Sequence, residues 1–294
     1  GQFNNDGFGV NDNLFSLVED LLVNPSSGTD GVTTLHHNVE LDDADAGGAD
    51  FEIVGDGDVV FNANTVVGTT MTVDTNADIA DDSNPSNTRG TGPGGEFTVN
   101  GSSISATDVN TTVRIFTGSD DDDGGQFQFN TIDDGTGNAR NHISNLLVDT
   151  RGATSTDDGL ILVTGSEITT RDGGAGPAIA GGDQVWLGPI DLRSGGTVTV
   201  TGNDVFFGLS SSTDATLGTS VLAADVLATP VEVDNSSINS TGNTDTLVVN
   251  SESDLGGTGT AGNTLFGGKV GAARTAEAEV GPAIIAAAAD ALMR

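Results

Sequence analysis

Apolar and polar residues alternate in short runs along most of the chain, and one run shows the repeating element clearly. Val198 and Val200 alternate with threonines, which is the period of a β-strand with one buried face. Gly202 then tolerates the positive φ of a sharp bend, and Val205 and Phe207 resume the alternation beyond it. The run therefore predicts a strand, a corner and a second strand.

This strand–corner–strand pattern recurs along the chain with variable spacing. Further copies are Phe51–Val59, Met71–Ile79, Phe97–Ile104, Ile161–Ile168, Val231–Ile238 and Leu247–Leu255. The bends resemble corners between flat sheets more than the tight Asn-Gly turns of hairpins. We therefore expect an all-β fold, a β-solenoid in which successive turns stack. A β-sandwich, which also repeats strands and glycine turns, is the alternative.

Helical patterns are confined to the two ends. After an extended arm, Gly1–Val10, the apolar spacing from Leu14 to Leu22 predicts a short amphipathic helix that covers one end of the solenoid. The alanine-rich segment Ala283–Met293 predicts a second helix. The resulting divisions are an N-terminal arm and capping helix (1–31), a β-solenoid body (32–266) and an alanine-rich C-terminal helix or tail (267–294).

The chain is strongly acidic, with 43 Asp and Glu residues against 9 Lys and Arg residues and a formal net charge of -34. Because binding to a phosphate backbone rests on Lys and Arg, this charge excludes nucleic acid as a partner. It also opposes compaction by self-repulsion unless salt or divalent cations screen it. The composition is typical of proteins from salt-loving organisms and of calcium-loaded exported proteins, so we expect a saline or calcium-rich setting.

One loop concentrates the acidic residues. Asp120, Asp121, Asp122 and Asp123 are consecutive and precede a Gly-Gly pair. Adjacent carboxylates repel one another, and hard oxygen ligands of this kind suit Ca²⁺. We single out these four residues as a candidate calcium site, with a solvated acidic loop as the alternative.

Few side chains suit catalysis. The chain has three histidines, His36, His37 and His142, with no Cys and no Tyr. Adjacent residues on a strand face opposite sides, so His36 and His37 do not form one metal site. Asp183 and Asp204 illustrate a carboxylate pair of the kind that glycosidases use, but many other Asp pairs would serve as well. We therefore predict that the chain is not an enzyme.

The chain resembles secreted β-helical exoproteins of the filamentous-haemagglutinin and autotransporter-passenger type. The runs that carry the resemblance are Gly-Gly-Thr-Val-Thr-Val-Thr-Gly-Asn-Asp-Val from Gly195, Gly-Glu-Phe-Thr-Val-Asn-Gly-Ser-Ser-Ile from Gly95 and Gly-Leu-Ile-Leu-Val-Thr-Gly-Ser-Glu-Ile from Gly159. The resemblance implies a right-handed parallel β-helix, an extracellular or cell-surface location and an adhesive or structural role. Such repeats have no invariant catalytic or ligand motif, so no functional residue carries over.

Our main hypothesis is a secreted structural surface protein, a self-assembling filament, surface-layer or adhesin subunit that cations or high salt stabilise. The arm Gly1–Val10 suits strand addition to a neighbouring subunit, which predicts a homo-oligomer or filament at the cell surface or in the extracellular matrix; a capped monomer is the competing possibility. No apolar run is long enough to span a bilayer.

Two other functions stay open. A polysaccharide-active lyase or hydrolase on a β-helix is the alternative. An ice-binding solenoid is suggested by Thr197, Thr199 and Thr201, and would require threonines at the same positions on successive turns.

Overall fold

The computed structural model describes residues 2–3, 21–23, 32–36, 39–40, 50–55, 57–62, 65–67, 70–76, 92–100, 103–106, 111–119, 122–132, 143–154, 156–165, 167–170, 182–208, 222, 237–240, 245–251, 264–267, 270–271 and 285–287. These residues form short β-strands, and none of them is helical. The described part of the chain accordingly has no helix long and apolar enough to cross a membrane.

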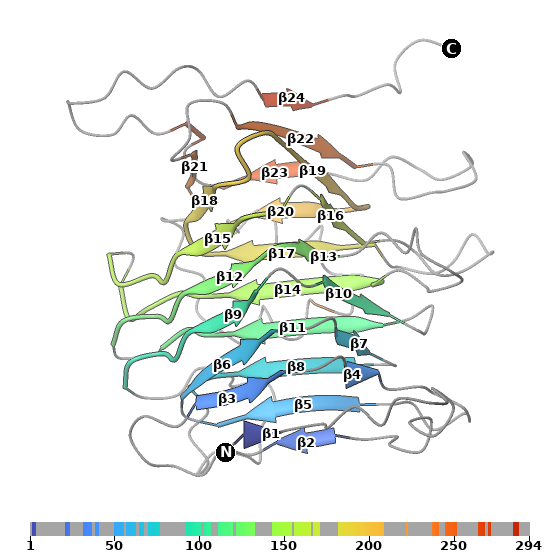
Figure 1. Ribbon diagram of the computed structural model, residues 1–294. Helices are drawn as coiled ribbons and strands as arrows, with labels where there is room; N and C mark the ends of the chain where they lie inside the picture. Colours follow the sequence, from blue (N-terminus) through green and yellow to red (C-terminus); the bar gives the residue numbers. More distant parts are fainter. Residues whose placement is uncertain are drawn as a thin grey trace.

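The strands belong to three sheets of eight (Figure 1). Sheet A consists of β1 (Gln2–Phe3), β3 (Val32–Leu35), β6 (Asp58–Phe61), β9 (Phe97–Val99), β12 (Phe127–Phe129), β15 (Ile161–Val163), β18 (Ile190–Leu192) and β21 (Ile238–Ser240). Sheet B consists of β2 (Leu21–Val23), β5 (Asp50–Val54), β8 (Thr70–Asp74), β11 (Thr112–Phe116), β14 (Asn145–Asp149), β17 (Gln184–Leu187), β20 (Val205–Phe207) and β23 (Thr264–Phe266). Sheet C consists of β4 (Val39–Glu40), β7 (Thr65–Val67), β10 (Ser103–Ala106), β13 (Thr131–Ile132), β16 (Glu167–Thr169), β19 (Thr197–Thr201), β22 (Thr246–Asn250) and β24 (Ile285–Ala287).

From β3 to β23 the chain visits sheets A, C and B in turn, so each strand pairs with the strand three positions later. We call one such set of three strands a rung. Every strand pair in the described residues is parallel. This arrangement is consistent with a parallel β-helix, and it excludes the β-sandwich, whose sheets are antiparallel.

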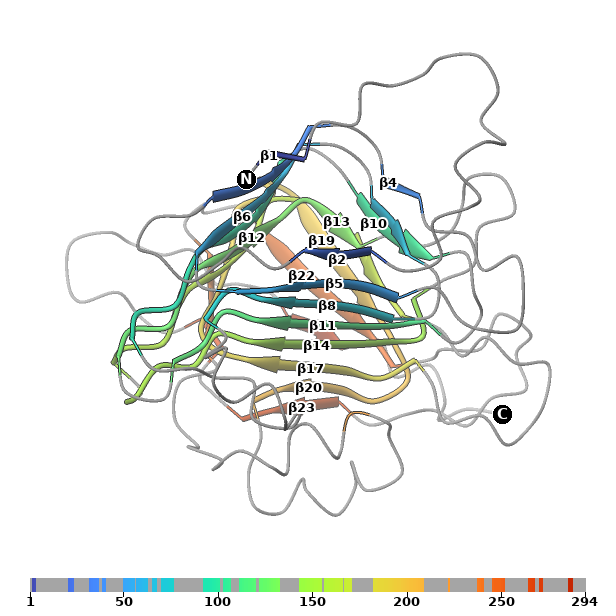
Figure 2. The ribbon, with the colours of Figure 1, turned by 90° about the horizontal axis from the view of Figure 1, so that it is seen from below.

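The three sheets surround one apolar core. Figure 2 shows the arrangement of the three sheets along the stack. Alternate residues of the strands point inward, as the burial of Val198 and Val200 between more exposed threonines shows. Aromatic rings from successive rungs contact one another inside the core. The ring centroids of Phe61 and Phe97 are 4.9 Å apart in an edge-to-face arrangement. Phe97 and Phe127, with centroids 5.1 Å apart, and Phe129 and Trp186, at 5.7 Å, are stacked. Because aromatic residues make up 4% of the chain, Val, Ile and Leu side chains fill most of the remaining space in the core.

The predicted strand–corner–strand pattern is confirmed where the structure describes it. Its copies fall at different corners: Val198–Phe207 spans β19 and β20 between sheets C and B, Phe97–Ile104 spans β9 and β10 between sheets A and C, and Phe51–Val59 spans β5 and β6 between sheets B and A. Residues 231–236 of a further copy lie outside the described residues. One turn therefore contains the pattern more than once, which explains its irregular spacing.

The two predicted end helices are not seen in the described residues. Leu21 and Leu22, the last residues of the first one, belong to β2, and Ile285–Ala287 of the second forms β24; their other residues lie outside the described part. β2 pairs with β5 and β24 pairs with β22. A helix this short is marginal in water, whereas an exposed sheet edge supplies ready backbone partners for a strand.

Candidate functional site

The most regular surface feature is a stack of corners that connect sheet B to sheet A. We call it the B–A corner; its described parts are residues 74–76, 92–96, 116–119, 122–126, 149–154 and 156–160. In the figures these connections lie side by side as a projecting ridge beside β9, β12 and β15 (Figures 1 and 2).

Threonines at the ends of sheet B strands hold the ridge together. In each corner the hydroxyl donates to a glycine carbonyl just before the next sheet A strand: Thr75 to Gly95 at 2.7 Å, Thr117 to Gly125 at 2.6 Å and Thr150 to Gly159 at 2.7 Å. All three threonines are fully buried. These hydrogen bonds close each corner and satisfy the three buried hydroxyls.

The glycine partners form a ladder of their own. A Cβ added at Gly125 would lie 2.6 Å from the carbonyl carbon of Gly95 and closer still to its oxygen, and one at Gly159 would meet Gly125 in the same way. Because the obstacles are backbone atoms, they cannot rotate aside as a side chain would. Successive corners therefore approach to a distance that only glycine permits.

Two of the four candidate calcium residues, Asp122 and Asp123, lie on this ridge. Asp120 and Asp121 are outside the described residues, and Asp122 and Asp123 are exposed. The backbone carbonyl of Asp122 accepts from Ala153 N–H at 3.0 Å, and that of Asp123 accepts from Gly94 N–H at 2.8 Å. These two residues thus link their corner to the corners on both sides.

The next corner has a second acidic pair. Asp157 occupies the place that Asp123 has one rung earlier, since its carbonyl accepts from Gly124 N–H at 2.7 Å. Its carboxylate accepts from the Thr154 hydroxyl at 2.7 Å, and the Asp158 carboxylate accepts from Gly152 N–H at 2.9 Å. Among the described residues, no group of three or more Asp, Glu, His or Cys residues is placed to hold a metal ion. Calcium binding stays a prediction.

A buried ion pair lies under the ridge. The Asp149 carboxylate accepts from both Arg151 Nε, at 2.9 Å, and Nη2, at 2.6 Å, and the two side chains are 3% and 7% exposed. Asp149 also accepts from the Arg151 backbone N–H at 3.1 Å, and Asp74 makes the same bond to Asn76 N–H at 3.1 Å. Short Asp side chains therefore fold the chain back after these strands.

The Asp pair considered for catalysis is brought onto adjacent rungs. Asp183 is buried, and its carboxylate accepts from the backbone N–H of Asp204 at 3.2 Å. Asp183 N–H in turn donates to Asn145 Oδ1 at 3.4 Å. The bonds connect three rungs at the corner between sheets C and B. Of the histidines, His36 is exposed after β3, and His37 and His142 are outside the described residues.

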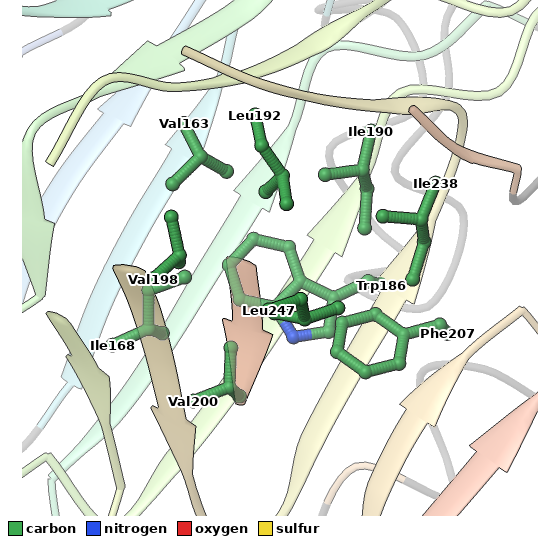
Figure 3. A pocket seen from close by; sticks show the side chains of 10 residues that line it. All are labelled: Val163, Ile168, Trp186, Ile190, Leu192, Val198, Val200, Phe207, Ile238 and Leu247. Carbon is green, nitrogen blue, oxygen red and sulfur yellow. The ribbon is translucent and has the colours of Figure 1, made fainter. Parts of the chain in front are cut away.

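A small cavity lies inside the core (Figure 3). It measures ≈ 10 Å³ and its lining is apolar, with Trp186, Phe207 and Leu247 among the side chains that point into it. Its apolar lining offers no polar partners that would hold an ordered water molecule. The nearby polar atoms are engaged elsewhere: Trp186 Nε1 donates to Gln184 Oε1 at 3.1 Å, and Gln184 Nε2 donates to the Thr201 carbonyl at 2.9 Å. The cavity is a packing defect of the core.

The outer face of sheet B carries a second apolar cluster, which the sequence pattern did not predict. Phe116, Leu147, Val185, Leu187 and Phe206 are buried there although they point away from the main core. Leu222, from the connection between β20 and β21, completes the cluster and is itself 0% exposed. A signal was present, because Val185–Leu187 and Val205–Phe207 are continuous apolar runs, typical of strands buried on both faces.

The threonines of β19 do not continue as a ladder on sheet C. Thr197 is in register with Thr246, and Thr201 with Thr169, but Thr199 lies between Glu167 and Val248. The central position therefore changes chemistry at each rung, which does not favour the ice-binding hypothesis.

Comparison of the chain with protein-family models, curated proteins and solved structures finds no match. Functional inference therefore rests on the residues described above.

Proposed function

We propose that the three sheets form one right-handed parallel β-helix and that the chain is a structural surface protein, secreted and self-assembling into a filament, surface layer or adhesive structure. Right-handedness follows from the strong preference for right-handed crossovers between parallel strands of one sheet. The location outside the cell and the adhesive or structural role follow from the resemblance to β-helical exoproteins.

One observation carries the self-assembly part of this proposal. Among the described strands, each of the three parallel sheets ends in an edge strand at both ends of the stack: β1, β2 and β4 at one end, and β21, β23 and β24 at the other, with Val270 bridging to β21. Edge strands offer backbone donors and acceptors to a further strand unless charge, proline or a cover prevents it. Among the described residues, no helix covers either end.

The buried polar groups support a structural role over the polysaccharide-active alternative. Asp149 binds Arg151, Asp183 accepts from a backbone N–H of the next rung, and Asp245 accepts from the Ser194 and Ser240 hydroxyls at 3.2 and 2.6 Å. Each of these carboxylates closes a corner or joins two rungs. Carboxylates used in this way stabilise the stack and are poorly placed to exchange protons with a substrate.

The arm provides a test of self-assembly. Gln2 and Phe3 pair as β1 with Thr34 and Leu35 of the same chain, so the described part of the arm forms an edge of sheet A. We expect the full chain to form large particles in molar salt, and deletion of Gly1–Val10 to reduce their size, because the deletion removes that edge. Light scattering and electron microscopy measure the result. Equal particle sizes would exclude the arm as an assembly element, and a full chain that stays monomeric would contradict self-assembly.

We further predict that the melting temperature rises with molar salt and with Ca²⁺. A net charge of -34 disfavours the folded state by self-repulsion, and ions that screen or bind these carboxylates reduce that penalty. Thermal scans in NaCl, and in CaCl₂ against NaCl of equal ionic strength, separate screening from binding.

The matched variant for calcium carries Asn in place of Asp120, Asp121, Asp122 and Asp123. If this variant gains as much from millimolar Ca²⁺ as the parent chain does, the loop is not the calcium site. Indifference of the parent chain to both salts would remove the argument for a saline or calcium-rich setting.

A further inference from the structure

The two ends of the stack have complementary outlines. At the N-terminal end, β1 and β2 add a strand to sheets A and B beyond the rung of β3, β4 and β5, and among the described residues sheet C has no strand there. At the C-terminal end the situation is reversed, since β24 extends sheet C beyond the rung of β21, β22 and β23. Among the described strands, each end therefore carries those that the other lacks, although Val270 also bridges to the outer edge of β21 in sheet A (Figure 1).

From these outlines we infer, resting on the proposed self-assembly, that a second copy of this chain docks head to tail, and that β1 and β2 of one copy and β24 of the other make one shared rung. Every strand is parallel to its neighbours, so only a copy with the same orientation along the stack continues all three sheets. A twofold arrangement would place antiparallel strands together at the contact. A heterologous contact of this kind does not close and gives a filament.

The strand registers define the contact residue by residue. We call residues that are in register on successive strands of a sheet a column. In sheet B, the column that begins at Leu22 continues through Glu52, Thr72, Arg114, Leu147, Val185 and Phe206 and ends at Leu265. Through the same strand pairings, the column of Leu21 ends at Thr264 and the column of Val23 ends at Phe266. The three residues of β2 in one copy therefore fall on the three residues of β23 in the next.

Sheet A gives an independent match. The column of Gln2 runs through Thr34, Val60, Thr98, Gln128, Leu162 and Asp191 to Asn239. In the same register, Phe3 corresponds to Ser240, the residue after Asn239. Within the molecule, Val270 bridges to Ile238, the remaining residue of β21. Gly271 N–H also donates to the Ile238 carbonyl at 2.8 Å, so Val270 and Gly271 run along the edge of β21, and an incoming β1 has to displace Gly271 from beside Asn239.

The chemistry of the edges favours this contact. In an acidic chain, the edge strands Leu21–Val23, Thr264–Phe266 and Ile285–Ala287 contain no charged residue and no proline, the usual devices that prevent edge pairing. The core is also less covered at the C-terminal end. Its residues up to Leu247 and Val249 are at most 4% exposed, whereas Phe266 and Val270 pack against it only partly buried. A second copy would cover both.

Engineered cysteines test the register directly, because the chain contains no Cys. The proposed contact places Leu22 of one copy beside Leu265 of the next, with Cα atoms about 4.8 Å apart as in any parallel pair, which is within disulfide range. The two positions of one chain lie at opposite ends of the stack. A chain with both Leu22→Cys and Leu265→Cys is therefore expected to give a ladder of covalent multimers on oxidation in molar salt, resolved on a non-reducing gel.

The control variants also test disulfide formation between engineered cysteines. An equimolar mixture of the Leu22→Cys and Leu265→Cys single variants should give mixed dimers and nothing longer. Leu22→Cys combined with Thr197→Cys, at an exposed position on β19 and away from both end strands, should give no ladder. Gln2→Cys with Asn239→Cys repeats the test in sheet A, in case the first pair disturbs folding. Parent particles in molar salt with no ladder from either pair would overturn the shared rung but leave self-assembly intact. A parent chain that remains monomeric would overturn both.

Discussion

Replacing Gly125 by alanine is expected to unfold or rearrange the B–A corner and to lower the melting temperature by many degrees. The new Cβ would collide with the backbone of Gly95, so the two corners would have to separate and the 2.6 Å hydrogen bond from the Thr117 hydroxyl to the Gly125 carbonyl would weaken. Overpacking of this kind costs about 1–3 kcal/mol and more where the obstacle is rigid. Thermal and denaturant melts followed by circular dichroism measure the loss.

Gly196→Ala is the matched control. A Cβ at Gly196 would meet nothing within 4 Å, so the change is expected to be neutral or to stabilise by up to about 1 kcal/mol through the unfolded state. Gly159→Ala should behave like Gly125→Ala, because it meets the next carbonyl of the same ladder. Equal melting temperatures for Gly125→Ala and Gly196→Ala would mean that the corners do not stack as described.

Removal of the Arg151 guanidinium should be the second large effect. Arg151→Ala leaves the Asp149 carboxylate, 3% exposed, in the interior without its bidentate partner. Breaking one side of a buried ion pair costs about 3–5 kcal/mol. Since the pair is shielded from water, the loss should persist in molar salt, where exposed pairs are screened.

The chain contains a comparison pair with the same spacing. Arg193 contacts Asp191 at 2.9 Å, but its side chain is 44% exposed. The Asp191 side chain is 7% exposed, so Arg193→Ala also takes a partner from a buried carboxylate, but water reaches the Arg193 side of the pair. Arg193→Ala is therefore expected to cost less than Arg151→Ala, and less in high salt than in low salt. Unfolding free energies for the two alanine variants in low and high salt provide the test. Similar small losses for both would show that Arg151 is more accessible than its packing implies.

The sequence pattern predicted the strands better than their connections. Val198, Val200, Val205 and Phe207 alternate so regularly that strand, corner and strand followed directly, because alternation reports which face of a strand is buried. The prediction of end helices was wrong at Leu21 and Ile285, which belong to strands. A short segment with helical spacing can instead pair with the edge of a sheet, and the sequence alone does not show where that edge lies.

The hydrogen bonds between threonines and glycines in the B–A corner could not be predicted from residue spacing in the sequence. The bonded residues are 20 positions apart for Thr75 and Gly95 but 8 apart for Thr117 and Gly125. Loops of unequal length hide the equivalence, and only the tripeptide Val-Asp-Thr, at 73–75 and again at 148–150, hinted at it. The acidic residues at 122, 123, 157 and 158 were recognisable as turn-formers, but their stacking on adjacent corners depends on the same unequal loops.

The unequal lengths of the corner connections also indicate how a molecule of this kind can change in size. The described strands of one rung pair with those of the rungs before and after, whereas the connections between strands differ in length from rung to rung. Duplication or loss of three successive strands would preserve every inward-facing column and alter the stack by about 4.8 Å. The length of the stack can therefore change by one turn at a time while its cross-section stays constant.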